Sequence, residues 1–158
     1  MMQSLDRRLA TEFAEKLARI PEDQKPLWGK MNRAQLYGHL EMVLRYTMGE
    51  GQPLPYRGKW IYRHVFRHLV VNGIMEFPHN VRLPRPKGEK EPVPPVATLE
   101  DLKQTLNAYV SAAEGGTLPA RQHPFFGELS GRAWQKFHVG HFKHHLKQFG
   151  VWDAPIGG

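Results

Sequence analysis

Hydrophobic residues near the start of the chain recur every three or four positions, a spacing that predicts a helix. We place this helix over residues 4–19, with Ser4 as its N-cap and Pro21 as its stop. The stripe that it would bury consists of Leu5, Leu9, Phe13, Leu17 and Ile20. The chain therefore begins with an amphipathic helix that needs a partner for its apolar face.

Two further helices have clear signals at both ends. One is expected over 33–49 behind Asn32, where glycines and prolines follow it closely. The other is expected over 99–114 behind Thr98, with Asp101 at the capping-box position. Both segments repeat apolar residues at helical spacing, so we expect each to bury one face.

Two more helical patterns differ in how much of their surface is apolar. The segment 58–73 is apolar on more than one side, so we expect it to be buried between neighbouring helices. The last helix is expected over 131–149, between Ser130 and Gly150, with lysines opposite its apolar arc.

The connections complete the expected architecture. Residues 76–97 contain six prolines, which exclude a regular helix there and indicate a long crossover between antiparallel elements. The segment HPFFGEL, 123–129, is expected to form an aromatic loop, and no alternating pattern predicts a strand. We therefore predict an all-α fold, a four-helix bundle with an additional N-terminal helix and a long proline-rich crossover, in a single domain over 1–158.

Composition narrows the functional classes. The formal net charge is +7, but the basic residues are scattered and form no DNA-binding motif, which favours a solvated basic surface over nucleic-acid binding. There is no cysteine, which excludes disulfides and zinc–thiolate sites and fits a cytoplasmic protein. No apolar stretch approaches the roughly 20 residues that span a bilayer, and the N-terminus lacks an apolar signal core. We expect no membrane association.

Histidines provide the candidate chemistry, because four of the nine fall on the last predicted helix. At about 100° per residue, His138, His141 and His145 lie within its apolar arc, and His144 lies at the edge. His141 and His145 are four residues apart, so both imidazoles can reach one cation at about 2.0–2.1 Å. His138 and His141, three apart, are the alternative pair.

The helix over 33–49 contributes His39, which also falls among apolar positions. A single inward histidine is more often a hydrogen-bonded core residue than a metal ligand. Three inward histidines on two helices, however, each need partners for their ring nitrogens, and one shared divalent ion would bind three nitrogens at once. His39, His141 and His145 are therefore the candidate metal ligands, with ordinary burial as the alternative.

A rival pair lies on the helix over 58–73. His64 and His68 are four residues apart, but each follows an arginine, Arg63 or Arg67. Two fixed positive charges beside the pair oppose a dication. We interpret this segment as a basic face, and the alternative is an anion-binding strip that lines a pocket.

Three segments carry a family resemblance. WGKMNRAQLYGHLEMVLR (28–45), HPFFGELS (123–130) and HFKHHLKQFG (141–150) resemble the DinB-like superfamily, and more narrowly a branch described as a domain of unknown function. The resemblance covers most of the chain, and the HxxxH-L-x-Q-F ending is its most specific element. It implies a four-helix bundle with a metal site near one end.

The resemblance also implies roles for particular residues. One histidine ligand from the first bundle helix and an HxxxH pair from the last match His39, His141 and His145, the same three that the helical projection favours. Gln148 would support the site or pack beside it. Trp28 and Lys30 belong to the WGKM signature, and we expect them to close the end of the bundle.

Some members of the superfamily transfer low-molecular-weight thiols such as bacillithiol or mycothiol, so the resemblance implies candidate chemistry. Zinc or nickel on three neutral histidines keeps its double charge and an open position, where a thiol or water would lose its proton near neutral pH. A metal-bound thiolate could then attack an electrophilic small molecule. Phe125 and Phe126 are candidates for a pocket wall, although core packing is their more frequent role.

The sequence is also compatible with other functions. A non-catalytic bundle, with the metal in a structural or sensing role, predicts a fourth protein ligand such as His138 or Glu41. A nucleic-acid binder is less favoured. The resemblance makes a homodimer possible, but the sequence identifies no interface, no substrate and no particular metal.

Overall fold

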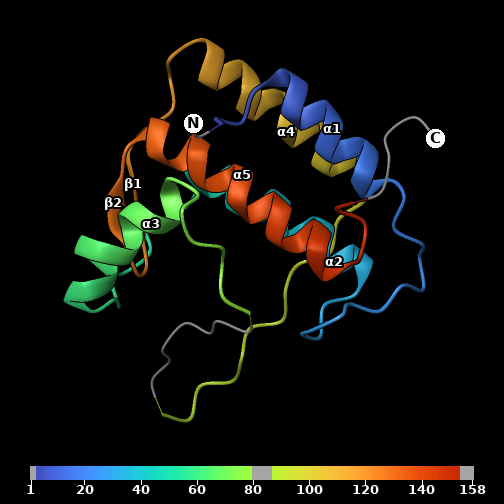
Figure 1. Cartoon of the computed structure of the whole chain (residues 1–158), viewed down its shortest axis with the longest axis horizontal. Coiled ribbons are helices and arrows are strands. Elements are labelled where there is room, and N and C mark those ends of the chain that lie inside the picture. Colours follow the sequence, from blue (N-terminus) through green and yellow to red (C-terminus); the bar gives the residue numbers. More distant parts are fainter. Residues whose placement is uncertain (1–2, 80–86, 154–158) are drawn as a thin grey trace.

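The computed structural model describes residues 3–79 and 87–153, and these are mostly helical with one small sheet (Figure 1). In chain order the elements are α1 (Arg7–Leu17), α2 (Arg33–Thr47), the π-helical η1 (Tyr62–Phe66), α3 (Arg67–Val71), α4 (Leu99–Glu114), β1 (Arg121–His123), β2 (Gly127–Leu129) and α5 (Gly131–Gln148). The prediction of a mostly helical chain is confirmed, whereas the strands were not expected.

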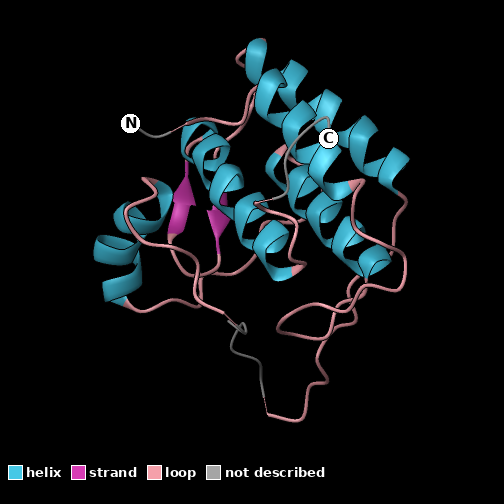
Figure 2. Ribbon diagram, turned by 45° about the vertical axis from the view of Figure 1, so that its right-hand side comes forward, coloured by secondary structure: helices cyan, strands magenta, loops and turns pink. Residues whose placement is uncertain are grey.

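The main core lies where α1, α2, α4 and α5 meet, with α4 and α5 each in contact with both α1 and α2. Figures 1 and 2 show these helices gathered on one side of the molecule. The apolar stripe predicted for the first helix is buried there, and Phe13 stacks on Phe142 of α5 at 5.2 Å between ring centroids. Removal of this apolar surface from water stabilises the arrangement of α2 and α5, the two helices with the candidate ligands.

Three of the predicted N-caps are confirmed. Asn32 and Thr98 each form a reciprocal capping box, with Gln35 and Asp101 respectively, and the Ser130 hydroxyl accepts a hydrogen bond from the backbone of α5. These contacts satisfy backbone N–H groups that the first turn of a helix leaves without partners. They also fix where each helix starts along the chain.

The start of α1 differs from the prediction. Its N-cap is Asp6, whose carboxylate accepts a hydrogen bond from the Leu9 N–H, and not Ser4. The residue before Asp6 contacts another helix: the Leu5 N–H donates a hydrogen bond to the Gln135 carbonyl of α5. The Leu5 N–H is therefore bonded to α5 before the first helix begins at Arg7.

The prediction that the helix over 58–73 is buried between neighbouring helices is wrong. Residues 60–71 are helical, with a π-helical turn in the middle, but Trp60 is 70% exposed and Ile61 43% exposed. Only the end of the segment is covered, where Val70 and Val71 join a smaller core with residues of β2, the turn before it and α5. Figures 1 and 2 show η1 and α3 to one side of the main helices, beside the strands.

The expected aromatic loop is in part a β-hairpin. β1 pairs antiparallel with β2, with Arg121 opposite Leu129 and His123 opposite Gly127. Its turn is held by His123 Nδ1, which accepts hydrogen bonds from the backbone N–H groups of Phe125 and Phe126. Strands of three residues are too short to produce a recognisable alternation, which is why the sequence pattern missed them.

The described parts of the proline-rich crossover, 76–79 and 87–97, contain no helix or strand, as predicted. The prediction also covers 80–86, which lie outside the described residues. Both described ends lie close to glycines of the main helices: a Cβ on Gly38 would lie 1.9 Å from the Pro95 carbonyl oxygen, and one on Gly140 would lie 2.8 Å from the Phe77 ring. Across the described residues, no helix is long and apolar enough to cross a bilayer.

Candidate metal centre

Three histidines converge from two helices. The His39 Nε2 of α2 lies 3.0 Å from the His141 Nε2 of α5, and the His145 Nε2 lies 3.1 Å from the same atom. All three ligand atoms lie within 4.8 Å of one another. Two nitrogens bound at about 2.0–2.1 Å to a tetrahedral ion stand about 3.3 Å apart, so these rings are already close to the spacing that a shared metal requires.

The rings meet edge to edge. Their planes are inclined by 72–77° to one another, with centroids 4.7–5.0 Å apart. This orientation follows from the helices: His141 and His145 lie one turn apart on α5, and His39 reaches them from α2. A stacked arrangement would bring ring faces together, whereas here the nitrogen atoms point to a common region.

Burial determines the protonation state of the three imidazoles. It lowers the pKa of His39 to about 4, and it lowers the pKa values of His141 and His145 well below the ordinary range. Charge on neighbouring histidines adds to the effect in each case. All three rings are therefore neutral near pH 7, which is the form that binds a metal ion.

Gln148 fixes the tautomer of His145. The amide nitrogen of Gln148 donates to the Trp28 carbonyl at 2.9 Å, so its oxygen must face His145 Nδ1, 2.7 Å away. An amide oxygen can only accept, and His145 Nδ1 must therefore carry the proton. The lone pair of His145 consequently lies on Nε2 and points into the cluster, as a ligand would require.

The protein alone cannot satisfy the cluster. A neutral His141 with its proton on Nε2 could donate to the Nε2 of His39 or of His145, but one proton cannot serve both well. With the proton on Nδ1 instead, that buried atom has no hydrogen-bond partner and the Nε2 lone pairs face one another. A cation among the three nitrogens would bind the three Nε2 lone pairs and remove their repulsion, so the donor set fits a divalent metal ion. The Nδ1–H of His141 would still lack a partner among the described residues.

Neither of the two proposed fourth ligands joins the cluster. His138 Nε2 lies 2.8 Å from the Thr47 hydroxyl, with its ring edge-on to Tyr109. The Glu41 carboxylate accepts from the Thr105 hydroxyl at 3.0 Å and lies beside Arg45. The alternative pair of His138 and His141 therefore does not form, and His138 is a hydrogen-bonded core residue.

Aromatic residues border the histidine cluster on the side of the crossover. Trp28 stacks on His79 at 3.6 Å between centroids, and His144 lies within 6 Å of both rings. Phe77 lies 6.0 Å from the ring of His141. The expected role of Trp28 at the bundle end agrees with these contacts, whereas Lys30 is exposed. Phe77 and His79 had no signal in the sequence, because they lie in the proline-rich crossover and belong to no periodic element.

The remaining sequence candidates lie elsewhere. His64 and His68 are both exposed, which fits a basic face. Phe126 is buried in the smaller core and Phe125 packs against it, so both have the structural role that is more frequent for such residues. Nothing in these contacts places them at the histidine cluster.

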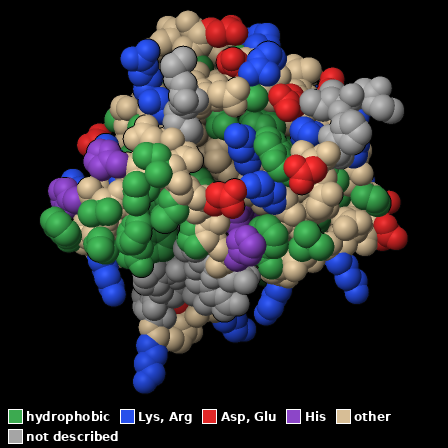
Figure 3. Space-filling model, in the orientation of Figure 1, with side chains coloured by type: hydrophobic (Ala, Val, Ile, Leu, Met, Phe, Trp, Pro, Cys, Tyr) green, Lys and Arg blue, Asp and Glu red, His purple; other side chains and the backbone are tan. Residues whose placement is uncertain are grey.

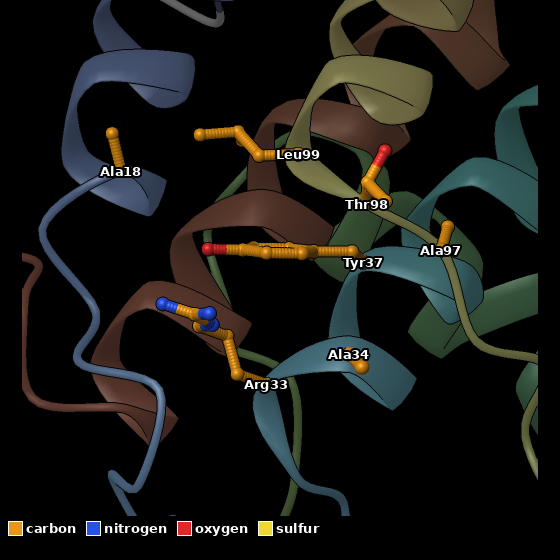
Figure 4. Close-up of a pocket in the computed structure, with 7 residues that line it drawn as sticks. All are labelled: Ala18, Arg33, Ala34, Tyr37, Ala97, Thr98 and Leu99. Atoms are coloured by element: carbon orange, nitrogen blue, oxygen red, sulfur yellow. The ribbon is translucent and has the colours of Figure 1, made fainter.

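A cavity of about 290 Å³ lies apart from the histidines, between the end of α1 and the starts of α2 and α4 (Figure 4). Its polar groups already have partners: the Tyr37 hydroxyl donates to the Leu17 carbonyl, and the Arg33 guanidinium donates to the Ile20 carbonyl. Figure 4 shows these two side chains lying one above the other in the cavity. Since none of the three histidines lines it, the cavity is separate from the metal centre.

Comparison with known proteins gives one family. The model of the family described as "Protein of unknown function (DUF1569)" matches residues 2–151. No curated protein and no solved structure gives a significant match to the chain. The family description states no activity.

Proposed function

The chain belongs to the DUF1569 family, and we propose that its function depends on a divalent metal ion, zinc or nickel, bound by His39, His141 and His145. The observation that carries the proposal is the convergence of three neutral Nε2 atoms from α2 and α5. Three protein donors supply only three of the four positions around a tetrahedral ion, and a fourth position filled by water or substrate is typical of catalytic sites.

We further propose that the protein is an enzyme that transfers a low-molecular-weight thiol to an electrophilic small molecule. A divalent ion on three imidazoles would supply the positive charge that lowers the pKa of an incoming thiol. The chain has no cysteine, so the sulfur nucleophile would have to come from a cosubstrate. A hydrolase-like reaction uses the same open position with water in place of the thiol.

The residues around the cluster have separate tasks in this proposal. Gln148 holds His145 with its lone pair toward the ion, and the burial of His141 keeps that ring neutral. Trp28 and His79 lie at the border of the cluster, where an incoming substrate would meet flat aromatic surfaces. The surrounding apolar residues strengthen electrostatic attraction at the site by limiting the access of water.

The resemblance to the DinB-like superfamily supports the same proposal. Its expected ligands are the three histidines that converge, and four helices, α1, α2, α4 and α5, pack around one core. The N-terminal helix takes the place in this core that was expected for the helix over 58–73. DinB-like membership, a cytoplasmic location and a small-molecule substrate remain predictions.

The decisive experiment is metal analysis of purified protein. We expect near-stoichiometric metal in the wild type and loss in His39→Ala, His141→Ala and His145→Ala. His64→Ala is the matched control, because His64 is exposed and outside the cluster, and it should retain the metal. Metal retained in all three cluster variants would falsify the ligand assignment.

A second experiment separates an enzyme from a non-catalytic metal protein. Consumption of small thiols is measured against a panel of electrophiles, with and without a chelator. Chelator-sensitive consumption supports the transferase. A protein that binds metal at the three histidines but consumes no thiol and hydrolyses no substrate in such panels supports the structural or sensing alternative.

A further inference from the structure

A second pocket, of about 210 Å³, lies between α3 and the first turns of α5 and has a strongly basic lining. Arg67, Arg132 and Lys136 contribute fixed positive charges, His68 and Asn72 contribute further polar groups, and no acidic residue lines it. Within the part of the chain that the structure describes, no carboxylate pairs with any of the three cations. The pocket therefore attracts anions.

The surrounding chain does not neutralise this charge. No Asp or Glu occurs between Gly51 and Met75, and none occurs between Leu129 and Trp152. The N-terminus of α5, capped by Ser130, also points its positive dipole end at this region. A phosphate group matches both the charge and the hydrogen-bond donors of the pocket.

Exposed apolar side chains continue from the pocket along the same segment. Trp60, His64 and His68 are spaced four residues apart; the rings of the first two lie 5.3 Å apart, and His68 lines the pocket. Ile61 and Val65, 43% and 40% exposed, are adjacent to this row. Figure 3 shows hydrophobic side chains gathered over η1 and α3, bordered by histidine and by Lys or Arg.

We propose that this surface binds an anionic phospholipid membrane, with the α3–α5 pocket on a lipid phosphate and with Trp60, Ile61 and Val65 in the interfacial layer. Cationic residues beside exposed Trp and aliphatic residues are what a peripheral interfacial contact requires. A second copy of the chain fits poorly, because a symmetric contact would bring the unpaired cations of both copies together.

This contact is peripheral and does not depend on the metal centre. The expectation of no membrane association rests on the lack of an apolar stretch long enough to span a bilayer, and a peripheral contact needs no such stretch. The contact would place the proposed metal site beside a membrane.

Co-sedimentation of the full chain with vesicles tests the proposal. We expect binding to vesicles that contain phosphatidylglycerol, weak binding to pure phosphatidylcholine vesicles, and a decrease as salt is raised. Binding that is equal for the two compositions, or absent from both, overturns the proposal.

Paired variants distinguish this surface from the general basicity of the chain. Arg132→Gln with Lys136→Gln should weaken binding about tenfold or more, whereas Lys25→Gln with Lys103→Gln removes the same charge from exposed sites elsewhere and should have a much smaller effect. Trp60→Ser with Ile61→Ser should weaken binding more than Val93→Ser with Val96→Ser, which are also exposed. Equal effects of test and control pairs overturn the assignment.

A conservative variant gives a direct readout of insertion. Lipids with brominated acyl chains should quench part of the tryptophan fluorescence of the wild type, and this part should be lost in Trp60→Phe while vesicle binding remains. If Trp60→Phe leaves the quenching unchanged, Trp60 does not enter the interface. If inorganic phosphate stabilises the protein through Arg132 and Lys136 but vesicles do not bind, the pocket takes free phosphate and the membrane proposal is wrong.

Discussion

At the scale of single residues, Gln148 should control metal affinity without touching the metal. Its side-chain oxygen holds the Nδ1 proton of His145, and its amide nitrogen is anchored on the Trp28 carbonyl. In Gln148→Leu the His145 ring loses this partner and can rotate, so we expect metal affinity to fall by about 10–100-fold. Competition with a chromogenic chelator measures the change.

The same substitution at Gln135 is the matched control. Gln135 also lies on α5, and its amide donates to the Leu5 carbonyl, away from the histidine cluster. Gln135→Leu should cost some stability but leave metal affinity within about twofold. A similar loss of affinity in both variants would mean that general loosening of α5, and not the orientation of His145, is responsible.

Helical spacing in the sequence was enough to predict the candidate metal ligands, but it did not predict which residues contact them. Helical spacing places His39, His141 and His145 on apolar faces, and the structure brings those faces together. His138 lies on the same apolar face of α5, three residues before His141, but its ring contacts Thr47 and not the cluster. Only tertiary packing decides between these outcomes, since both rings occupy buried positions at helical spacing.

At the scale of elements, the signals that worked are local. Capping residues such as Asn32 and Thr98 act within one turn, so the sequence contains the whole interaction. Trp60 is the opposite case. Its apolar neighbours in the sequence predicted burial, but whether another element covers it depends on the tertiary structure, which leaves it exposed. The hairpin, in which Arg121 pairs with Leu129, depends on strand pairing and on a turn, and the spacing of apolar residues predicts neither.

The close contact between Gly38 of α2 and Pro95 of the crossover predicts that a side chain at position 38 destabilises the protein. In Gly38→Ala the new methyl group would meet the Pro95 carbonyl oxygen at 1.9 Å and its carbon at 2.4 Å, so the backbone of one element must move. We expect a loss of about 1–3 kcal/mol in the free energy of unfolding, despite the gain in helix propensity that alanine brings. Urea denaturation measures it.

Gly140→Ala is the informative comparison. Its methyl group would meet the edge of the Phe77 ring at 2.8 Å, and a side chain can shift where a carbonyl cannot. The gain of up to about 1 kcal/mol from helix propensity should then offset most of the cost. If both variants lose equal stability, backbone contact at Pro95 is not the distinguishing factor.

At the scale of the whole molecule, a metal ion would cross-link α2 and α5, which are far apart in the sequence. A ligand that binds only the folded state at 100 times its Kd stabilises that state by about 2.7 kcal/mol. For a chain of 158 residues we expect a rise in Tm of about 5–11 °C when zinc is added to metal-free protein. His141→Ala should remove this rise, whereas a rise that persists there would place the binding elsewhere.

Buried histidines make the stability of the whole molecule depend on pH. Burial lowers the pKa values of His138 and His123 to about 3, well below the 6.5 of an unfolded chain. Between these pKa values the unfolded chain binds more protons, so the free energy of unfolding falls as the pH falls through this window and levels off below about 3. For each such histidine the loss between pH 7 and pH 5 is about 2 kcal/mol.

A single variant isolates one contribution to this pH dependence. His138→Gln can keep a hydrogen bond to Thr47 but cannot titrate, so metal-free protein with this change should lose about 2 kcal/mol less than wild type between pH 7 and pH 5. His64→Gln makes the same substitution at an exposed position outside both cores and is the control, which should leave the difference unchanged. Urea unfolding of all three proteins at both pH values measures the effect. An unchanged pH dependence in His138→Gln would mean that this ring is not held neutral by burial, and the same argument for neutral imidazoles in the metal centre would then lose its support.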